Sequence, residues 1–270
     1  MKKRFIVLID FSTYSEWLLA FTYKWAQQVN SELLLVHHTT DLIPGLGDSE
    51  VLSELKYSSV ERSINKLKSL AETVVGNNPF IKYHSNSYNV SSAVMKLQES
   101  NTTDYVFVGM NDKTGIEKLL ISSTALQLAD NIERVIIALP TATSDFHYDQ
   151  LYIGIKNPHS LDTTHFEELL AITSDKYHHI TFFSVVKDKA PLNEITEYLQ
   201  LLCNKYAKLA SLSYKIFESE NTTQTIKDYM HENKGVLVIQ KGPRNFIDIF
   251  RPYFTTEIVH HAQIPVIILP

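Results

Sequence analysis

Residues 104–124 read DYVFVGMNDKTGIEKLLISST, and this stretch contains the pattern that decides the fold. A continuous apolar run, typical of a buried strand, ends at Gly109. A second glycine, Gly115, lies in the turn that follows, and the hydroxyl residues of 122–124 lead into a helix. A backbone that cradles a phosphate has this form, because glycine permits close approach and a helix start offers free N–H groups. Asp112 and Ser122, however, stand where such a cradle favours glycine.

Outward from this stretch, short apolar runs alternate with helical patterns. Strands are predicted at 3–10, 31–38, 80–88, 104–109, 134–140, 151–156, 179–186, 212–219, 235–240 and 264–269. Helices are predicted at 13–25, 48–75, 91–100, from 115, and at 161–174, 191–209, 225–233 and 254–262. Thr13 and Glu16 have the spacing of a capping box, which predicts Thr13 as the N-cap of the first helix.

This strand–helix series occurs twice, with a period of about 140–146 residues, which indicates two related domains. The predicted domains are 1–142 and 149–270, with a connector between them that has no periodicity. Strands that are apolar throughout and alternate with helices favour parallel sheets covered on both faces. The predicted fold class is therefore α/β, with two tandem, doubly wound, five-stranded parallel sheets.

The composition excludes several classes of protein. The net charge of −5 argues against a nucleic-acid partner, which usually requires a basic surplus. No apolar run reaches about 18 residues, so no membrane span is expected. The apolar run at the start stops at Asp10 and has no cleavage site after it, so it is predicted to be a strand and not a targeting segment. The single cysteine, Cys203, fits a reducing cytoplasm.

Three segments together resemble a tandem universal stress protein: FIVLIDFSTYSE (5–16), DYVFVGMNDKTG (104–115) and FTTEIVHHAQIPVIIL (254–269). The resemblance implies a Rossmann-like fold of the adenine nucleotide alpha hydrolase type. It also implies a regulatory role in stress responses. Single-domain relatives dimerise through their closing strands, so pairing of RVIIALP (134–140) with IPVIIL (264–269) is expected within this chain, and a homodimer is allowed.

Nucleotide-binding members of that family carry G-x2-G-x9-G-[ST] after the fourth strand and an aspartate at the end of the first strand. The resemblance implies ATP as the ligand, with Mg²⁺ only as its companion. The candidate site residues on this basis are Asp10, Gly109, Asp112, Ser122 and Ser123, with the adjacent Thr124. Two more candidates are Gly115, in the turn, and His38, which ends the second strand beside the presumed pocket. In the second half the motif positions hold Ile239, Gly242, Pro252 and Tyr253, with Lys156 at the strand end, so that half is predicted to bind no nucleotide.

Asp112 has a physical cost at a phosphate site. A carboxylate about 6 Å from a phosphate charge, at an effective dielectric near 20, disfavours binding by roughly 2–3 kcal/mol. That corresponds to roughly 30- to 150-fold in affinity, which Lys113 and Lys118 offset only in part. A working site and an inherited, weakened loop both remain open. For Asp10, ligand contact and a role as an N-cap or turn residue before the helix both remain open.

Other candidate sites are weaker. PGLGDSE (44–50) has G-x-G before a helix but lacks the third glycine, so a lid over the pocket is the better interpretation. Adjacent histidines, as in His37–His38, point to opposite strand faces and cannot chelate a metal as a pair. No general base can be identified, so slow ATP hydrolysis is the only reaction considered. The hypotheses are a regulatory adenine-nucleotide binder and a nucleotide-free interaction module of the same fold.

Overall fold

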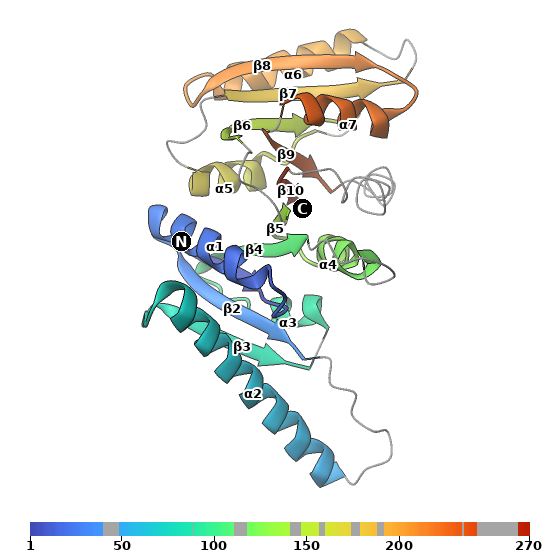
Figure 1. Ribbon diagram of the computed structural model, residues 1–270. Helices are drawn as coiled ribbons and strands as arrows, with labels where there is room; N and C mark the ends of the chain where they lie inside the picture. The colour runs from blue at the N-terminus through green and yellow to red at the C-terminus, as the bar shows by residue number, and fades with distance from the viewer. Residues whose placement is uncertain are drawn as a thin grey trace. The chain divides into compact units, whose positions relative to one another are not determined.

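The computed structural model describes residues 1–39, 49–87, 89–110, 118–140, 147–156, 160–173, 179–187, 192–233, 235–241 and 264–270. The chain divides into two compact units (Figure 1). The first contains Met1–Gly109 and Asp130–Ile132, and the second contains Met110–Ala129 and Glu133–Pro270. The domain boundaries predicted from the sequence, 1–142 and 149–270, remain predictions.

The first unit is built on four parallel strands in the order β3-β2-β1-β4. These are β1 (Lys2–Leu8), β2 (Glu32–His38), β3 (Ile81–Asn86) and β4 (Thr102–Met110). The helices are α1 (Ser15–Gln28), α2 (Ser49–Val75) and α3 (Val90–Lys96). Phe5 and Phe107, on neighbouring strands, are fully buried and have ring centroids 4.6 Å apart. Burial of both faces explains why these strands are apolar throughout.

The second unit contains α4 (Lys118–Asn131, whose last two residues belong to the first unit), α5 (Thr163–Thr173), α6 (Leu192–Tyr206) and α7 (Thr222–Asn233). Its strands are β5 (Val135–Pro140), β6 (His147–Gly154), β7 (His179–Val186), β8 (Ser211–Glu218), β9 (Gly235–Gln240) and β10 (Val266–Leu269). Their order is β5-β10-β9-β6-β7-β8. All of these pairs are parallel except β5 with β10.

The prediction of two separate five-stranded sheets needs correction. Within the second unit, β5 from the first half of the chain is hydrogen-bonded into the same sheet as the strands of the second half, in the order β5-β10-β9-β6-β7-β8. The expected contact between the two closing strands is confirmed, because Val266, Ile267 and Ile268 pair antiparallel with Ala138, Ile137 and Ile136. Short apolar strands with open edges would be a hazard, and this pairing covers them. The predicted helix at 254–262 lies outside the described residues.

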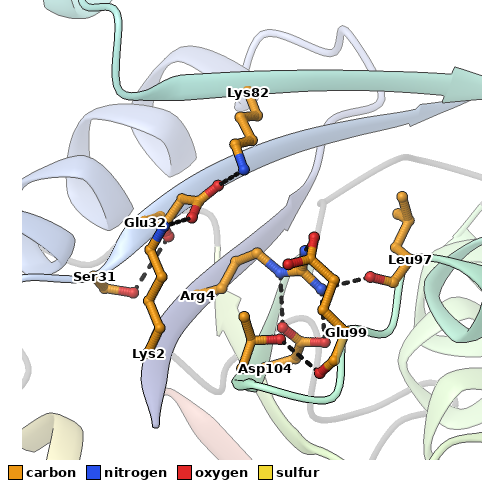
Figure 2. Close-up of polar contacts among 9 residues, drawn as sticks. Lys2, Arg4, Ser31, Glu32, Lys82, Leu97, Glu99 and Asp104 are labelled. Carbon is orange, nitrogen blue, oxygen red and sulfur yellow. Dashed lines mark hydrogen bonds and ion pairs between the residues drawn. The ribbon is translucent and has the colours of Figure 1, made fainter.

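A buried ion-pair network joins β1 to β4 in the first unit (Figure 2). Only 2% of Arg4 is exposed, and its Nε and Nη2 donate to the two carboxylate oxygens of Asp104 at 2.8 and 3.0 Å. Arg4 Nη1 also donates to Glu99, and Nη2 donates to the carbonyl of Leu97, both at 2.6 Å. Every side of the guanidinium therefore has an acceptor, which a buried cation requires.

Candidate functional site

The strand order of the first unit reverses between β1 and β4. The chain adds β2 and β3 on one side of β1 and then returns to add β4 on the other side. In open parallel sheets a ligand binds beyond the carboxyl ends of the strands at such a reversal. Asp10, which follows β1, and Gly109, near the end of β4, are the predicted site residues at this point.

Asp10 lies in the turn between β1 and helix α1. Its Oδ1 accepts a hydrogen bond from the backbone N–H of Ser12 at 2.9 Å and from Ser15 Oγ at 3.0 Å. The predicted capping box is wrong: the helix begins at Ser15, its N-cap is Tyr14, and that cap makes no side-chain hydrogen bond. Asp10 instead accepts from the turn before the helix and from the Ser15 hydroxyl, as short acidic side chains do in turns. The turn role left open for Asp10 is therefore present, and its contact with adenine stays a prediction.

Gly109 is required by packing. A Cβ at this position would lie 2.7 Å from Cε1 and 2.8 Å from Cδ1 of Tyr14. The Tyr14 ring is buried and stacks on Trp17 with centroids 5.0 Å apart, so it has little room to move away. The motif's glycine permits close approach to the backbone, and at Gly109 the Tyr14 ring makes that close approach.

The residue after Asp10 has an unusual backbone. Phe11 has φ = 59°, in the left-handed region where side chains other than glycine, asparagine and aspartate are rare. Its ring packs on the His37 ring with centroids 4.3 Å apart, and Lys66 Nζ lies 5.8 Å from the Phe11 centroid. The His37 Nδ1 is 2.7 Å from the carbonyl oxygen of Ile9, and with its proton on Nδ1 the ring donates to that carbonyl. The turn after β1 is held against β2 by these contacts.

Three buried polar atoms near the carboxyl ends of β1, β2 and β3 have no hydrogen-bond partner among the described residues. They are Ser12 Oγ, His38 Nδ1 and Ser85 Oγ. Only 6% of Ser85 is exposed, and it is in register with His37 on the neighbouring strand. Unpaired buried polar atoms are uncommon, and each is a place where a ligand or an ordered water would bind. Of the three, the sequence identified only His38.

The other predicted site residues are described in part or not at all. Asp112 and Gly115 lie outside the described residues, as do Gly242, Pro252 and Tyr253 of the second half. The expectation that residues 122–124 lead into a helix is wrong, because they lie inside α4, which begins at Lys118. The side chains of Ser122 and Ser123 are not described, and Thr124 is half-buried. In the second unit Ile239 is buried in β9. Lys156 follows β6, and burial and the nearby Lys187 lower its pKa.

The remaining chemistry in the described ranges is limited. No group of three metal-ligating side chains occurs there. None of the helices in those ranges combines the length and the apolar character that a membrane span needs. Cys203 is partly buried, and burial raises the pKa of its thiol, which disfavours the nucleophilic thiolate.

Burial lowers the pKa of His37, an effect that the hydrogen bond to Ile9 opposes only in part, and burial also lowers the pKa of His84. Below an unfolded-state pKa of about 6.5 the unfolded chain therefore binds protons that the folded chain does not. The free energy of unfolding should fall as pH decreases from about 7 to 5. Urea unfolding at several pH values measures this slope. His37→Gln should flatten it, and an unchanged slope in that variant would contradict the assignment.

Comparison with known proteins concerns the segment that contains Asp10 and Gly109. Residues 1–134 match the model of the universal stress protein family. This segment is a universal stress protein family domain. The match ends before β5, and a search of curated proteins found no relative. The sequence resemblance is thus confirmed for the first half, whereas a second domain of the family is not confirmed in that way.

Solved structures share the fold over nearly the whole chain. A universal stress protein from Archaeoglobus fulgidus is 11% identical, with a TM-score of 0.65, covering 98% of this chain and 95% of that one. A protein of unknown function from Pseudomonas aeruginosa is 12% identical, with a TM-score of 0.56 and coverage of 98% and 92%. The cytoplasmic domain of a prokaryotic cation chloride cotransporter is 12% identical, with a TM-score of 0.54 and coverage of 99% and 95%. At these identities the likeness supports the α/β fold alone.

Proposed function

We propose that this chain is a universal stress protein-like regulatory protein that binds ATP or another adenine nucleotide in its N-terminal domain. The observation that carries the proposal is the pair of unpaired polar atoms, Ser12 Oγ and His38 Nδ1, near the carboxyl ends of β1 and β2. A hydroxyl and an imidazole nitrogen suit the hydroxyl and phosphate groups of a nucleotide. The family match covers both residues.

The fit to a nucleotide is incomplete, and this supports a second candidate function. Tyr14 packs directly against Gly109, and Oδ1 of Asp10 is already engaged by Ser12 and Ser15. Two motif residues therefore have structural roles that need no ligand. The alternative is a nucleotide-free interaction module that acts through protein partners. One protein of similar fold is the cytoplasmic domain of a transporter.

Isothermal titration of the full chain with MgATP separates the two candidates. We expect weak binding by the wild-type protein. The Asp112→Gly variant should bind roughly 30- to 150-fold more tightly, because a like charge beside the phosphates is removed. Ser12→Ala should weaken binding by about three- to tenfold, the value of one neutral hydrogen bond.

A matched control is Ser184→Ala on β7. Ser184 Oγ is also buried without a partner among the described residues, but it belongs to the second unit. This variant should bind MgATP as the wild type does. Absence of heat for both the wild type and Asp112→Gly would reject the nucleotide and leave the interaction module. The single cysteine supports a reducing, cytoplasmic location for either function.

A further inference from the structure

The strand β8 ends the sheet of the second unit. It pairs in parallel with β7 along its full length, from Ser211 opposite His179 to Glu218 opposite Val186. No described strand lies on its other side, and Figure 1 draws it in orange at the margin of the unit. An edge strand of eight residues presents a row of backbone N–H and C=O groups to any chain that can pair with it.

Edge strands are usually protected by charged side chains, especially lysine, and this protection is weak at β8. The one lysine of the strand, Lys215, has its ammonium 4.8 Å from the Phe217 ring centroid and 4.7 Å from that of Tyr229. Both contacts lie over the face of the sheet that α7 covers, so this cation is drawn away from the edge. Charged side chains protect an edge only where they project past it.

Exposed apolar side chains lie on β8 itself and on or just after α6, the helix that packs on it. Leu201 on α6 is 59% exposed, Leu209 after α6 is 61% exposed, and Tyr214 on β8 is 40% exposed. A hydrogen bond of 3.1 Å from Gln200 Nε2 to the Tyr214 hydroxyl ties α6 to β8. We call Leu201, Leu209 and Tyr214 the β8 margin. They are the large hydrophobic residues of the second unit that are exposed within its described part. An apolar margin of this kind indicates an interaction surface.

The charges around β8 specify the partner. Lys208 precedes the strand, whereas Glu218 and Glu220 stand at its end, and all three are exposed. Lys208 lies in the turn before β8, and Glu220 lies just past the end of the strand. In an antiparallel pair of two β8 strands centred on Tyr214, the basic end of each strand therefore lies beside the acidic end of the other. The same register places Leu212 opposite Ile216, so apolar side chains also meet.

Strand β3, at the other end of the strand order, does not have basic and acidic ends that complement a second copy. Strand β3 (IKYHSN, 81–86) contains no acidic residue, and its Lys82 pairs with Glu32 on β2. The closing strands β5 and β10 are already paired with each other. Among the described strands, β8 is the edge whose sequence complements a second copy of itself.

We propose that two copies of this chain associate through antiparallel pairing of their β8 strands. The arrangement is two-fold symmetric and closes on itself, so it forms a dimer and not a fibre. The β8 margin of each copy packs against the other, and Lys208 and Glu220 form two symmetric ion pairs. This proposal is independent of nucleotide binding, because β8 belongs to the second unit.

Sedimentation equilibrium of the full chain over a range of concentrations tests the dimer. The mean mass should rise from 30.9 kDa toward twice that value. Lys208→Glu and Glu220→Lys should each weaken association by about tenfold, because each replaces two opposite-charge pairs with two like-charge pairs. An equal mixture of the two variants should regain association, because both ion pairs of the mixed dimer are again of opposite charge, one as in the wild type and one with its charges exchanged.

Lys24→Glu on α1 is the matched control, because it changes the net charge as Lys208→Glu does at an exposed residue of the first unit. It should associate as the wild type does. A wild-type chain that stays at 30.9 kDa at every concentration would overturn the proposal. So would single variants that associate like the wild type, or a mixture that shows no recovery.

Discussion

Arg4→Met is expected to lower the free energy of unfolding of the first unit by about 3–5 kcal/mol. The substitution leaves the buried carboxylate of Asp104 without the two hydrogen bonds that Arg4 donates to it. Glu99 and the Leu97 carbonyl lose the same donor. An unpaired buried charge costs far more than the ion pair itself contributes, which explains the size of the effect. Urea unfolding followed by tryptophan fluorescence measures it, because both tryptophans, Trp17 and Trp25, lie on α1.

Two variants test the cause of this loss. Lys2→Met removes another cation from the same strand, but the Lys2 side chain is 60% exposed, so the loss should stay below about 1 kcal/mol. The double variant Arg4→Met with Asp104→Leu should recover much of the stability, because no buried charge remains unpaired there. If Arg4→Met lowered the free energy of unfolding no more than Lys2→Met does, the network would not be important for stability.

Gly109→Ala is expected to destabilise the protein by about 1–3 kcal/mol, the usual cost of overpacking. The added methyl group cannot fit without displacing the Tyr14 ring, which is itself stacked on Trp17. Thermal unfolding followed by circular dichroism measures the change. Combining Gly109→Ala with Tyr14→Leu should give a coupling energy of about 0.5–3 kcal/mol, because the smaller side chain makes room for the methyl group.

Gly154→Ala is a useful comparison for Gly109→Ala. A Cβ at Gly154 would be 3.4 Å from its nearest neighbour, Cζ of Phe183, and that distance is ordinary contact. Its effect should therefore be the smaller of the two. If Gly109→Ala left stability unchanged and weakened MgATP binding instead, Gly109 would serve a ligand and not the packing of Tyr14.

The sequence was sufficient to predict the strands. Runs such as DYVFVG are apolar at every position, so the buried strand β4 was expected where it occurs, with bounds one or two residues longer. The start of α1 was predicted wrongly from Thr13 and Glu16. The local pattern does not reveal that the helix has no side-chain cap, or that Asp10 accepts from Ser12 and Ser15 in the turn before it.

The sheet and part of the site depend on contacts that are distant in sequence. Pairing of β5 with β10 was expected, but a periodic pattern contains no information on whether such strands close two sheets or join one. Asp10 was identified from the family motif, and His38 because it ends an apolar strand. Ser85 was missed, since its importance comes from its burial in register with His37 on the neighbouring strand.

The position of β10 has a consequence for biosynthesis. Residues 266–269 pair with β5 on one side and β9 on the other, so an interior strand of the second unit is translated after both of its neighbours. While the nascent chain leaves the ribosome, the first unit can complete its own four strands, but β5 and β9 must wait with exposed apolar edges. This interval is when the chain is most open to chaperones and to aggregation.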